Sequence, residues 1–474
     1  MYLAGHFRVP EKIGHLMKSS WFLSSLLAGA ALSLWISQAD AQSLDAAMAQ
    51  AYMSNPTLNA QRAATRVTDE NLPQALGGYR PTVTATGDFS IEQTSTTTPL
   101  SRSTVGYTPG GVGVQVNQNL FNGFRTANSV RTAEANILGA RETLKNIEQQ
   151  VLLQAVTAYM NVFRDAALLN LQVNNVEVLE TQLKQTKDRF DVGEVTRTDV
   201  EQANASLASA RSQMFQAQAQ LKSSVATYRQ VVGSQPKSTL APVRPIGAIL
   251  PKNLDTCIKL GLLSHPAIVS ALHSVDAAAL QVKVAEGALY PSLNATGTVS
   301  QRYDVSGPHN EVFDATIGAT LTIPIYEGGV SYSKTRQAKE SLGQARIEAD
   351  VIREQVRAAI VSAWGSYDAS SAVIAAQQAE VQAAQVALAG VREEAKVGQR
   401  TTLDVLNQQQ LLLNAQATLI SAQRDRVVAA YTLLSSVGRL TARDLKLKVA
   451  AYDPVVHYDQ VRNKWIGTDT PDGR

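Results

Sequence analysis

Two regions of the chain alternate apolar and polar residues with a period of two. In the first region the alternation runs through TVTATGDFSI, which begins at Thr82, and resumes in VGVQVN, which begins at Val112. Successive side chains of a strand point to opposite faces of a sheet. Each run therefore predicts a strand with one apolar and one polar face, and a second region at about residues 291–327 repeats the pair.

The residue types on the two faces favour one kind of sheet over another. A half-buried sheet in a soluble sandwich is the commoner source of such alternation. Here the apolar positions hold small and aliphatic residues, and the polar positions hold threonine, serine, asparagine and glycine. The runs are about ten residues long, as a tilted outer-membrane strand requires. Bacterial barrels have about eight strands or more, so the strands that this chain lacks are expected from further copies of it.

Long helices are predicted after each pair of strands. No proline occurs between Pro109 and Pro236 or between Pro324 and Pro454. Within the first interval apolar residues recur every three or four positions, which is the spacing of a helix packed along one seam. This series includes Val151, Ala155, Ala158, Val162, Ala166 and Leu169. A plain antiparallel coiled coil accounts for these segments, taken alone, equally well.

Each helical segment is interrupted by the same short sequence. VGEVTRTDV, from Val192, returns as VGQRTTLDV, from Val397. Glycine commonly ends a helix in a left-handed C-cap. Thr196 and Thr401 follow these glycines, and each precedes an aspartate by three positions, which is the arrangement of a capping box at the start of a helix. Each stretch therefore predicts the tip of a helical hairpin.

An internal repeat covers almost the whole chain. SLDAAMAQAYMSNPTL, from Ser43, aligns with NLDTCIKLGLLSHPAI, from Asn253, and the tips pair Gly193 with Gly398. A repeat of this length is one structural unit used twice. The predicted parts begin with a signal peptide at 1–41 and end with a C-terminal equatorial tail at 439–474. Between them lies a first repeat at 42–252, with strands at about 81–122 and a helical hairpin at about 124–233. A second repeat follows at 253–438, with strands at about 291–327 and a hairpin at about 330–438.

Residues 1–41 have the composition of a secretory signal peptide. Basic residues precede an apolar run at 21–36, and the small-residue site ADA follows. A start at Met17 would give a more ordinary length, and either start exports the protein. No later stretch reaches the apolar length that a membrane helix needs, so any later span is expected to consist of strands. The single cysteine, Cys257, excludes an internal disulfide framework, and it lies too far from the cleavage site to carry a lipid anchor.

The order of these features resembles the TolC family of outer-membrane efflux and secretion channels. The resemblance rests on YRPTVTATG with LYPSLNATG, LFNG with IYEGG, and the two tips, and it covers nearly all of residues 42–467. It implies an α+β membrane protein, in which a homotrimer forms a twelve-stranded outer-membrane β-barrel continuous with a twelve-helix α-barrel in the periplasm. It also implies an equatorial girdle that includes residues 236–251 and the tail after Leu440.

The resemblance implies a function and partners as well. The channel would pass small molecules or secreted proteins from an inner-membrane pump of the RND or ABC type across the periplasm and the outer membrane. Its partners would be a periplasmic adaptor protein, that pump and outer-membrane lipid. The residues expected to contact the adaptor are Gly193, Val195, Gly398 and Thr401. Turn geometry explains the two glycines equally well.

A periplasmic gate is the third implication of the resemblance. Arg400 would tie its tip to the neighbouring hairpin near Thr198 and Asp199, and Asp404 would point into the pore. Both aspartates are also explained as helix caps.

The chain departs from the family pattern at two gate positions. Ala395 stands where well-known members have a tyrosine in the lock, and Asn407 replaces a second pore acid. A weaker seal and a thinner acidic ring are therefore expected.

Composition and motifs argue against an enzyme. The net charge of +3 gives no basic footprint for nucleic acid. The histidines lack metal-ligand spacing, His265 and His273 are expected to cap or pack a short helix, and GGVGVQ precedes no helix and so is no phosphate loop. No catalytic residue, metal site or cofactor is predicted. A passive porin and a periplasmic coiled-coil tether stay open as alternatives, although the long paired helices disfavour the first and the lipid-type strands the second.

Overall fold

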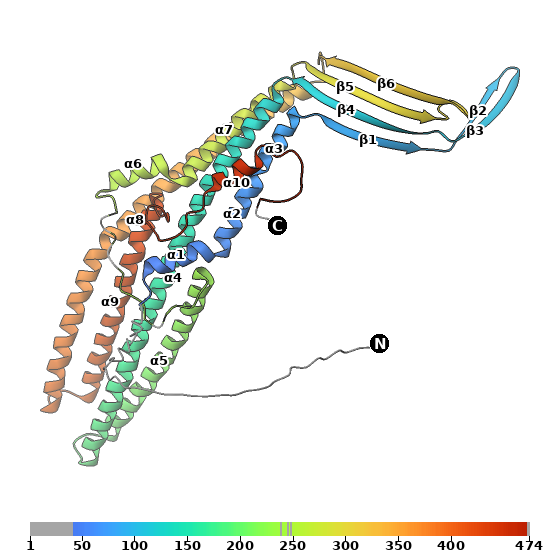
Figure 1. The fold of residues 1–474 in the computed structure, drawn as a ribbon. Helices are drawn as coiled ribbons and strands as arrows, with labels where there is room; N and C mark the ends of the chain where they lie inside the picture. The colour runs from blue at the N-terminus through green and yellow to red at the C-terminus, as the bar shows by residue number, and fades with distance from the viewer. Residues whose placement is uncertain (1–40, 238, 244–245, 247–248, 472–474) are drawn as a thin grey trace, which may run out of the picture. The chain divides into compact units, whose positions relative to one another are not determined.

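Four strands form one antiparallel sheet. The computed structural model describes residues 41–237, 239–243, 246 and 249–471, so the predicted signal peptide lies, but for its last residue, outside the described chain. The strands are β1 (Thr82–Phe89), β4 (Gly110–Asn122), β5 (Ser292–Tyr303) and β6 (Glu311–Thr322), and they lie in the order β1-β4-β5-β6 (Figure 1). Because β4 pairs directly with β5, the two halves of the repeat build a single sheet.

A further hairpin, β2 (Glu92–Thr98) with β3 (Ser101–Tyr107), lies between β1 and β4 in the chain and forms its own two-stranded sheet. No pattern in the sequence predicted this hairpin. Its first strand reads EQTSTTT, so both of its faces are polar. A strand with no apolar face gives no signal with a period of two.

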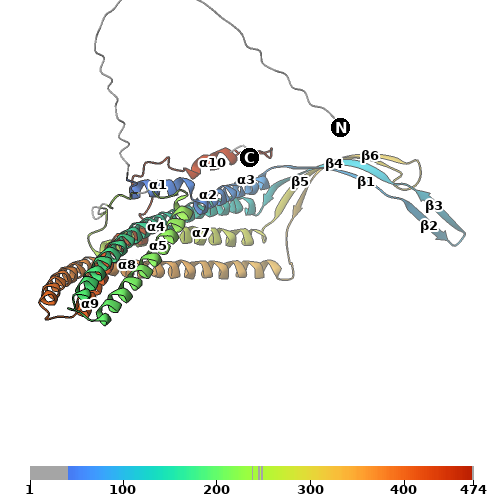
Figure 2. The ribbon, with the colours of Figure 1, turned by 90° about the horizontal axis from the view of Figure 1, so that it is seen from below.

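The predicted helical hairpins are present in both halves. In the first, α4 (Arg125–Asp191) packs along α5 (Arg197–Val232), and in the second, α8 (Val330–Lys396) packs along α9 (Thr402–Ser436). The two longest helices have 67 residues each, which at about 1.5 Å per residue is about 100 Å. Each starts close behind a strand, β4 or β6, so the hairpin tips lie at the helix ends remote from the sheet (Figures 1 and 2).

The remaining helices continue the lateral order of the strands. After α1 (Leu44–Ser54), α2 (Pro56–Asp69), α3 (Asn71–Leu76) and a 3-10 turn (Gly77–Tyr79) lead into β1, and α6 (Leu254–Ser264) and α7 (Pro266–Gly287) lead into β5. Helix α4 packs against both α2 and α7, and α7 packs against α8. The order α2-α4-α7-α8 therefore matches the strand order β1-β4-β5-β6.

The repeated Asn-Pro and His-Pro pairs start α2 and α7. Asn55 accepts hydrogen bonds at its Oδ1 from the backbone N–H groups of Thr57 and Leu58. His265 accepts one at Nδ1 from the N–H of Ala267, over 3.2 Å. Proline then occupies the first helical position, where no N–H is needed. His265 thus caps a helix, as predicted, although α7 has 22 residues and is not short.

One stretch of the described chain, Leu254–Gly287, is long and apolar enough to pass as a membrane-spanning helix. No such stretch was expected from the sequence. In the structure it is two helices, because His265 ends α6 and Pro266 begins α7. Helix α6 packs against α8, and α7 packs against α4 and α8.

The main hydrophobic core lies where the short helices meet the long ones. Tyr159 of α4 is completely buried there, and its hydroxyl lies 2.7 Å from the carbonyl oxygens of both Gln42 and Ala241. Leu250 from the link between the halves and Leu440 from the tail belong to the same cluster. Both irregular segments therefore pack against the long helices.

Candidate functional site

The strand register produces one face of the sheet that is apolar across all four strands. Ala85, Val114, Val299 and Ala315 are paired in one cross-strand row. The rows two positions away on either side share this face, because side chains alternate along each strand. They contain Val83, Val116, Gly297 and Ile317, and Gly87, Val112, Gln301 and Phe313. Several of these side chains are strongly exposed in the single chain, Ile317 to 94%.

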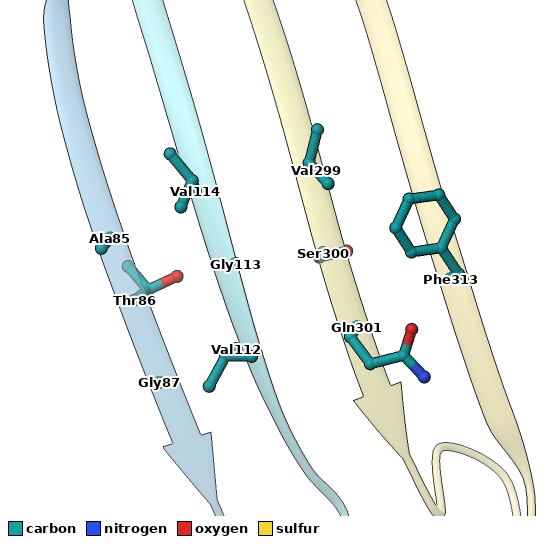
Figure 3. A pocket seen from close by; sticks show the side chains of 10 residues that line it. All are labelled: Ala85, Thr86, Gly87, Val112, Gly113, Val114, Val299, Ser300, Gln301 and Phe313. Atoms are coloured by element: carbon teal, nitrogen blue, oxygen red, sulfur yellow. The ribbon is translucent and has the colours of Figure 1, made fainter.

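A shallow hollow lies on this face (Figure 3). Ala85 and Gly87 fill little space on β1, and the larger side chains Val114, Val299 and Phe313 follow on the strands β4, β5 and β6. An uncharged surface of this kind is suited to flexible hydrocarbon chains. A continuous exposed apolar surface marks a contact with a membrane or another protein.

The opposite face is polar. Its rows include Thr84, Gln115, Thr298 and Thr316. Arg302 on β5 reaches across β4 and places its Nη2 3.1 Å from Oδ2 of Asp88 on β1. Gly111 lies between them, and a Cβ there would lie only 2.8 Å from the carbonyl oxygen of Gln301. The missing side chain therefore lets the ion pair cross the middle strand.

The two hairpin tips form capping boxes, as the sequence predicted. Gly193 and Gly398 end the incoming helices with φ angles of +83° and +78°. The backbone N–H of Thr196 donates to Oδ2 of Asp199 over 2.9 Å, and the N–H of Asp199 donates back to the threonine hydroxyl.

The second tip repeats this exchange. The N–H of Thr401 donates to Oδ2 of Asp404 over 2.9 Å, and the N–H of Asp404 donates back over 3.2 Å. Hydrogen bonds from the Thr196 hydroxyl and N–H lower the pKa of Asp199 below its ordinary value of 3.8. Those from the Thr401 N–H and hydroxyl lower the pKa of Asp404 likewise.

Each tip also has an ion pair of its own. Nε of Arg189 lies 3.0 Å from Oε2 of Glu194 at the first tip, and Nε of Arg400 lies 2.9 Å from Oε2 of Glu394 at the second. Glu394 raises the pKa of Arg400, first through this hydrogen bond. At the first tip the arginine precedes the glutamate in the chain, and at the second tip the glutamate precedes the arginine. These two pairs were not predicted from the sequence.

The described chain does not join Arg400 to the other hairpin. Among the described residues Arg400 is paired within its own tip, and no hydrogen bond links it to Thr198 or Asp199. Val195 and Asp199 are half-buried, whereas Thr198, Gly193, Gly398, Thr401 and Asn407 are exposed. The tie between hairpins therefore stays a prediction.

A cleft of about 1070 Å³ separates the hairpins near their tips. Its lining includes Arg189 and Glu194 from the first hairpin and Ala395 and Val405 from the second. Next to Val405 in the chain, Leu406 packs against Leu179 and Leu207. The small side chain of Ala395 thus borders open space, where a tyrosine would reach toward the first hairpin.

Acid should loosen both tips. A carboxylate whose pKa is lowered by folding stabilises the folded state at pH values above its ordinary pKa, here 3.8. This stabilisation is lost as the pH falls through the lower pKa of the folded state. We expect the hydrogen-exchange protection of the Asp199 and Asp404 amides, corrected for intrinsic rates, to fall between about pH 5 and about pH 3. D404N should remove the pH dependence at the second tip alone. Constant protection over this range would contradict the expectation.

No group of residues in the described chain has the composition and proximity of a metal site. His273 lies 3.8 Å from Asp276 on its own helix, and His457 lies 3.0 Å from Asp69. Cys257 is buried, and burial raises the pKa of its thiol. The GGVGVQ segment is part of β4, as predicted.

The described fold and sequence are similar to those of known channels. A model described as outer membrane efflux protein matches residues 47–234 and 257–439. The chain is 44% identical over 436 residues to outer membrane efflux protein BepC of Brucella suis biovar 1 (strain 1330), a match that covers 91% of this chain and 93% of that protein. It is 25% identical over 437 residues to outer membrane protein TolC of Escherichia coli (strain K12), with coverage of 89% and 87%.

A solved structure agrees with these matches. The Campylobacter jejuni CmeC outer membrane channel superimposes with a TM-score of 0.75 at 17% identity, over 97% of this chain and 98% of that one. At this identity the likeness concerns the fold. It covers both the sheet and the two helical hairpins described above.

Proposed function

We propose that three copies of this chain, which belongs to the outer membrane efflux protein family, assemble into one closed conduit across the outer membrane and the periplasm. As a member of this family the chain is an outer-membrane efflux and secretion channel and is not an enzyme. The predicted family, the fold of long helices joined to a sheet in two repeated halves, and the function as an efflux and secretion channel are confirmed. The trimer, the partners and the roles of individual residues are proposals.

The observation that carries a closed assembly is the four-stranded sheet with an apolar face and free edges, and membership of the family supports three copies. Within the described residues β1 and β6 are each paired on one side only. An unpaired edge inside a membrane leaves backbone N–H and C=O groups without partners, at a cost of several kcal/mol for each group. Pairing β6 of one copy with β1 of the next removes every edge, and three copies give twelve strands.

The purified protein should therefore be a trimer. Native mass spectrometry after detergent extraction should give three times the mass of one exported chain. A folded monomer that retains the sheet would contradict the proposal. The same trimer would place twelve helices, α2, α4, α7 and α8 from each copy, below the twelve strands.

The hairpin tips are the proposed docking site of a periplasmic adaptor, which would connect the channel to an inner-membrane pump of the RND or ABC type. Two tips in each chain give six similar tips in a trimer. Gly193, Val195, Gly398 and Thr401 lie at these tips. Their exposed turns suit end-to-end contact.

Photocrosslinkers at Val195 and Thr401 should capture an adaptor. A crosslinker on the wall formed by the long helices, at Val361 of α8 for instance, should not, although Val361 is 45% exposed in the single chain. Capture only from the wall would argue against tip docking. Failure to capture any adaptor, together with normal dye export in the cell, would argue for the passive porin.

The export function is tested in cells. A deletion strain should retain fluorescent dyes or fail to release a secreted protein, and the intact gene should restore the lost activity. The two readouts separate efflux of small molecules from protein secretion. A deletion strain that differs only in envelope integrity would instead support the tether.

The division of the chain stays a proposal. We place the first repeat at residues 42–252, the second at 253–438 and the tail at 439–474, after a signal peptide at 1–41. Both repeats contribute two strands to the four-stranded sheet, so neither repeat is expected to fold alone. N-terminal sequencing of the exported protein tests the cleavage site.

A further inference from the structure

The C-terminal tail returns to the base of the sheet. After α10 (Pro454–Val461) the chain runs back past α3 toward the start of β1 (Figure 1). There the guanidinium carbon of Arg80 lies 4.5 Å from the centre of the Trp465 ring, and Nη1 of Arg80 donates to the carbonyl oxygen of Lys464 over 3.0 Å. Arg80 stands two residues before Thr82, the first residue of β1.

The position of this tail is fixed by contacts lower down. Nδ1 of His457 lies 3.0 Å from Oδ2 of Asp69, which is completely buried at the end of α2. The guanidinium of Arg141 on α4 lies over the ring of Tyr458, 5.0 Å from its centre. Helix α10 is therefore held on α2 and α4, and the residues after it have a defined place.

Two large apolar side chains at this place have no apolar covering. Trp465 is 66% exposed and Ile466 is 88% exposed. One face of the indole contacts the guanidinium of Arg80. This charged group is hydrophilic, so it gives the ring no apolar covering. Adjacent exposed tryptophan and isoleucine side chains are unfavourable in water and indicate a binding partner.

Exposed aromatic residues occur at the same end of every strand of the sheet. Tyr79 precedes β1, Phe124 follows β4, Tyr290 precedes β5 and Tyr326 follows β6, with exposed fractions of 52%, 62%, 55% and 81%. Because neighbouring strands run antiparallel, these four positions lie at the same end of the sheet. Membrane barrels carry girdles of aromatic residues at both interfaces of the bilayer.

We infer that Trp465 and Ile466 form an anchor that inserts into the phospholipid surface at the periplasmic side of the outer membrane. The anchor lies beside Arg80, two residues before β1, at the end of the sheet that carries the four aromatic residues. Arg80 lies over the ring and Lys464 directly precedes it, and their positive charge complements lipid phosphate. Tryptophan suits this depth, because its ring is apolar while its N–H binds polar groups. The inference rests on the proposed placement in the outer membrane.

Depth-dependent fluorescence quenching tests the anchor. Trp21 and Trp35 lie in the proposed signal peptide, so W364F leaves Trp465 as the only tryptophan of the exported chain. The variant is reconstituted in vesicles of phosphatidylethanolamine and phosphatidylglycerol, with or without bromine on the acyl chains. We expect brominated lipid to remove most of the Trp465 emission, and bromine near the headgroup to quench more than bromine near the chain end.

The matched variant W465F keeps Trp364 as the only tryptophan of the exported chain. Trp364 lies near the middle of α8 and packs against the main core, so brominated lipid should leave its emission unchanged. Quenching of Trp465 by aqueous acrylamide but not by brominated lipid would overturn the anchor, because the tail would then face the periplasm. Shielding from both quenchers would overturn it in favour of packing against a second copy of the chain.

The membrane placement is measured separately in the same samples. Both variants should float with the vesicles and conduct ions in planar bilayers. If they do not insert, the proposed function fails and the anchor fails with it. If they insert and conduct while Trp465 stays unquenched by lipid, the anchor alone is wrong.

Discussion

Arginine in place of Val299 should prevent the chain from forming a stable membrane-inserted oligomer. Val299 lies near the middle of β5, in the apolar row with Ala85, Val114 and Ala315. On the lipid face of a barrel an arginine at the bilayer midplane costs about 2–4 kcal/mol. Each chain contributes one such residue, so a trimer bears this cost at three sites. The fraction of protein that inserts into vesicles and resists protease measures the effect.

The neighbouring residue provides the control. Thr298 lies on the polar face, in the row with Thr84, Gln115 and Thr316. T298R should therefore insert nearly as well as the parent and alter only ion selectivity, because residues on that face line the lumen. Equal loss of insertion in both variants would show that the two faces do not differ in environment. Loss in T298R alone would mean that the polar face contacts lipid.

The strands that the sequence predicted are those with an apolar face. Alternation is visible in β1, β4, β5 and β6 because lipid or protein must cover one side of each. The β2–β3 hairpin has no such constraint, so its polar residues form strands through backbone pairing that no local pattern reports.

The tips were predictable because capping is local. Glycine and a threonine three positions before an aspartate decide the conformation by contacts within one turn. Contacts between distant segments are different, because they require residues that lie far apart in the sequence to meet. Arg302 with Asp88 needs the register of strands from both repeats, and Trp465 with Arg80 needs the path of the whole tail. Sequence spacing contains none of this information.

Removing the Arg400 side chain should raise the single-channel conductance several-fold if this residue holds neighbouring tips together. R400A abolishes both the observed pair with Glu394 and the predicted tie to Thr198 and Asp199. E394Q removes the negative charge from the first of these and leaves the second intact. A neutral amide holds the guanidinium less strongly than a carboxylate does, so Arg400 is freer to bind the neighbouring hairpin, and the conductance should equal or fall below that of the parent. Planar bilayer recordings of the two variants at the same salt concentration make the comparison.

The outcome distinguishes a gate residue from a residue that supports its own turn. If R400A and E394Q raise the conductance equally, the pair inside the tip is the relevant contact, and the tie between hairpins is wrong. If neither changes it, the seal lies elsewhere in the cleft lined by Ala395. A395Y should then lower the conductance, because the larger side chain would fill that space.

Asp404 requires a different comparison, since its carboxylate already caps α9. D404A should leave the conductance similar to that of the parent and weaken block by multivalent cations, because rings of carboxylates attract cations at a pore entrance. T401V removes the hydroxyl of the same capping box and keeps the charge. It should loosen the tip as D404A does, yet retain cation block. Equal loss of block in both variants would assign Asp404 to the cap alone, and the acidic charge at the pore entrance would have to come from other residues.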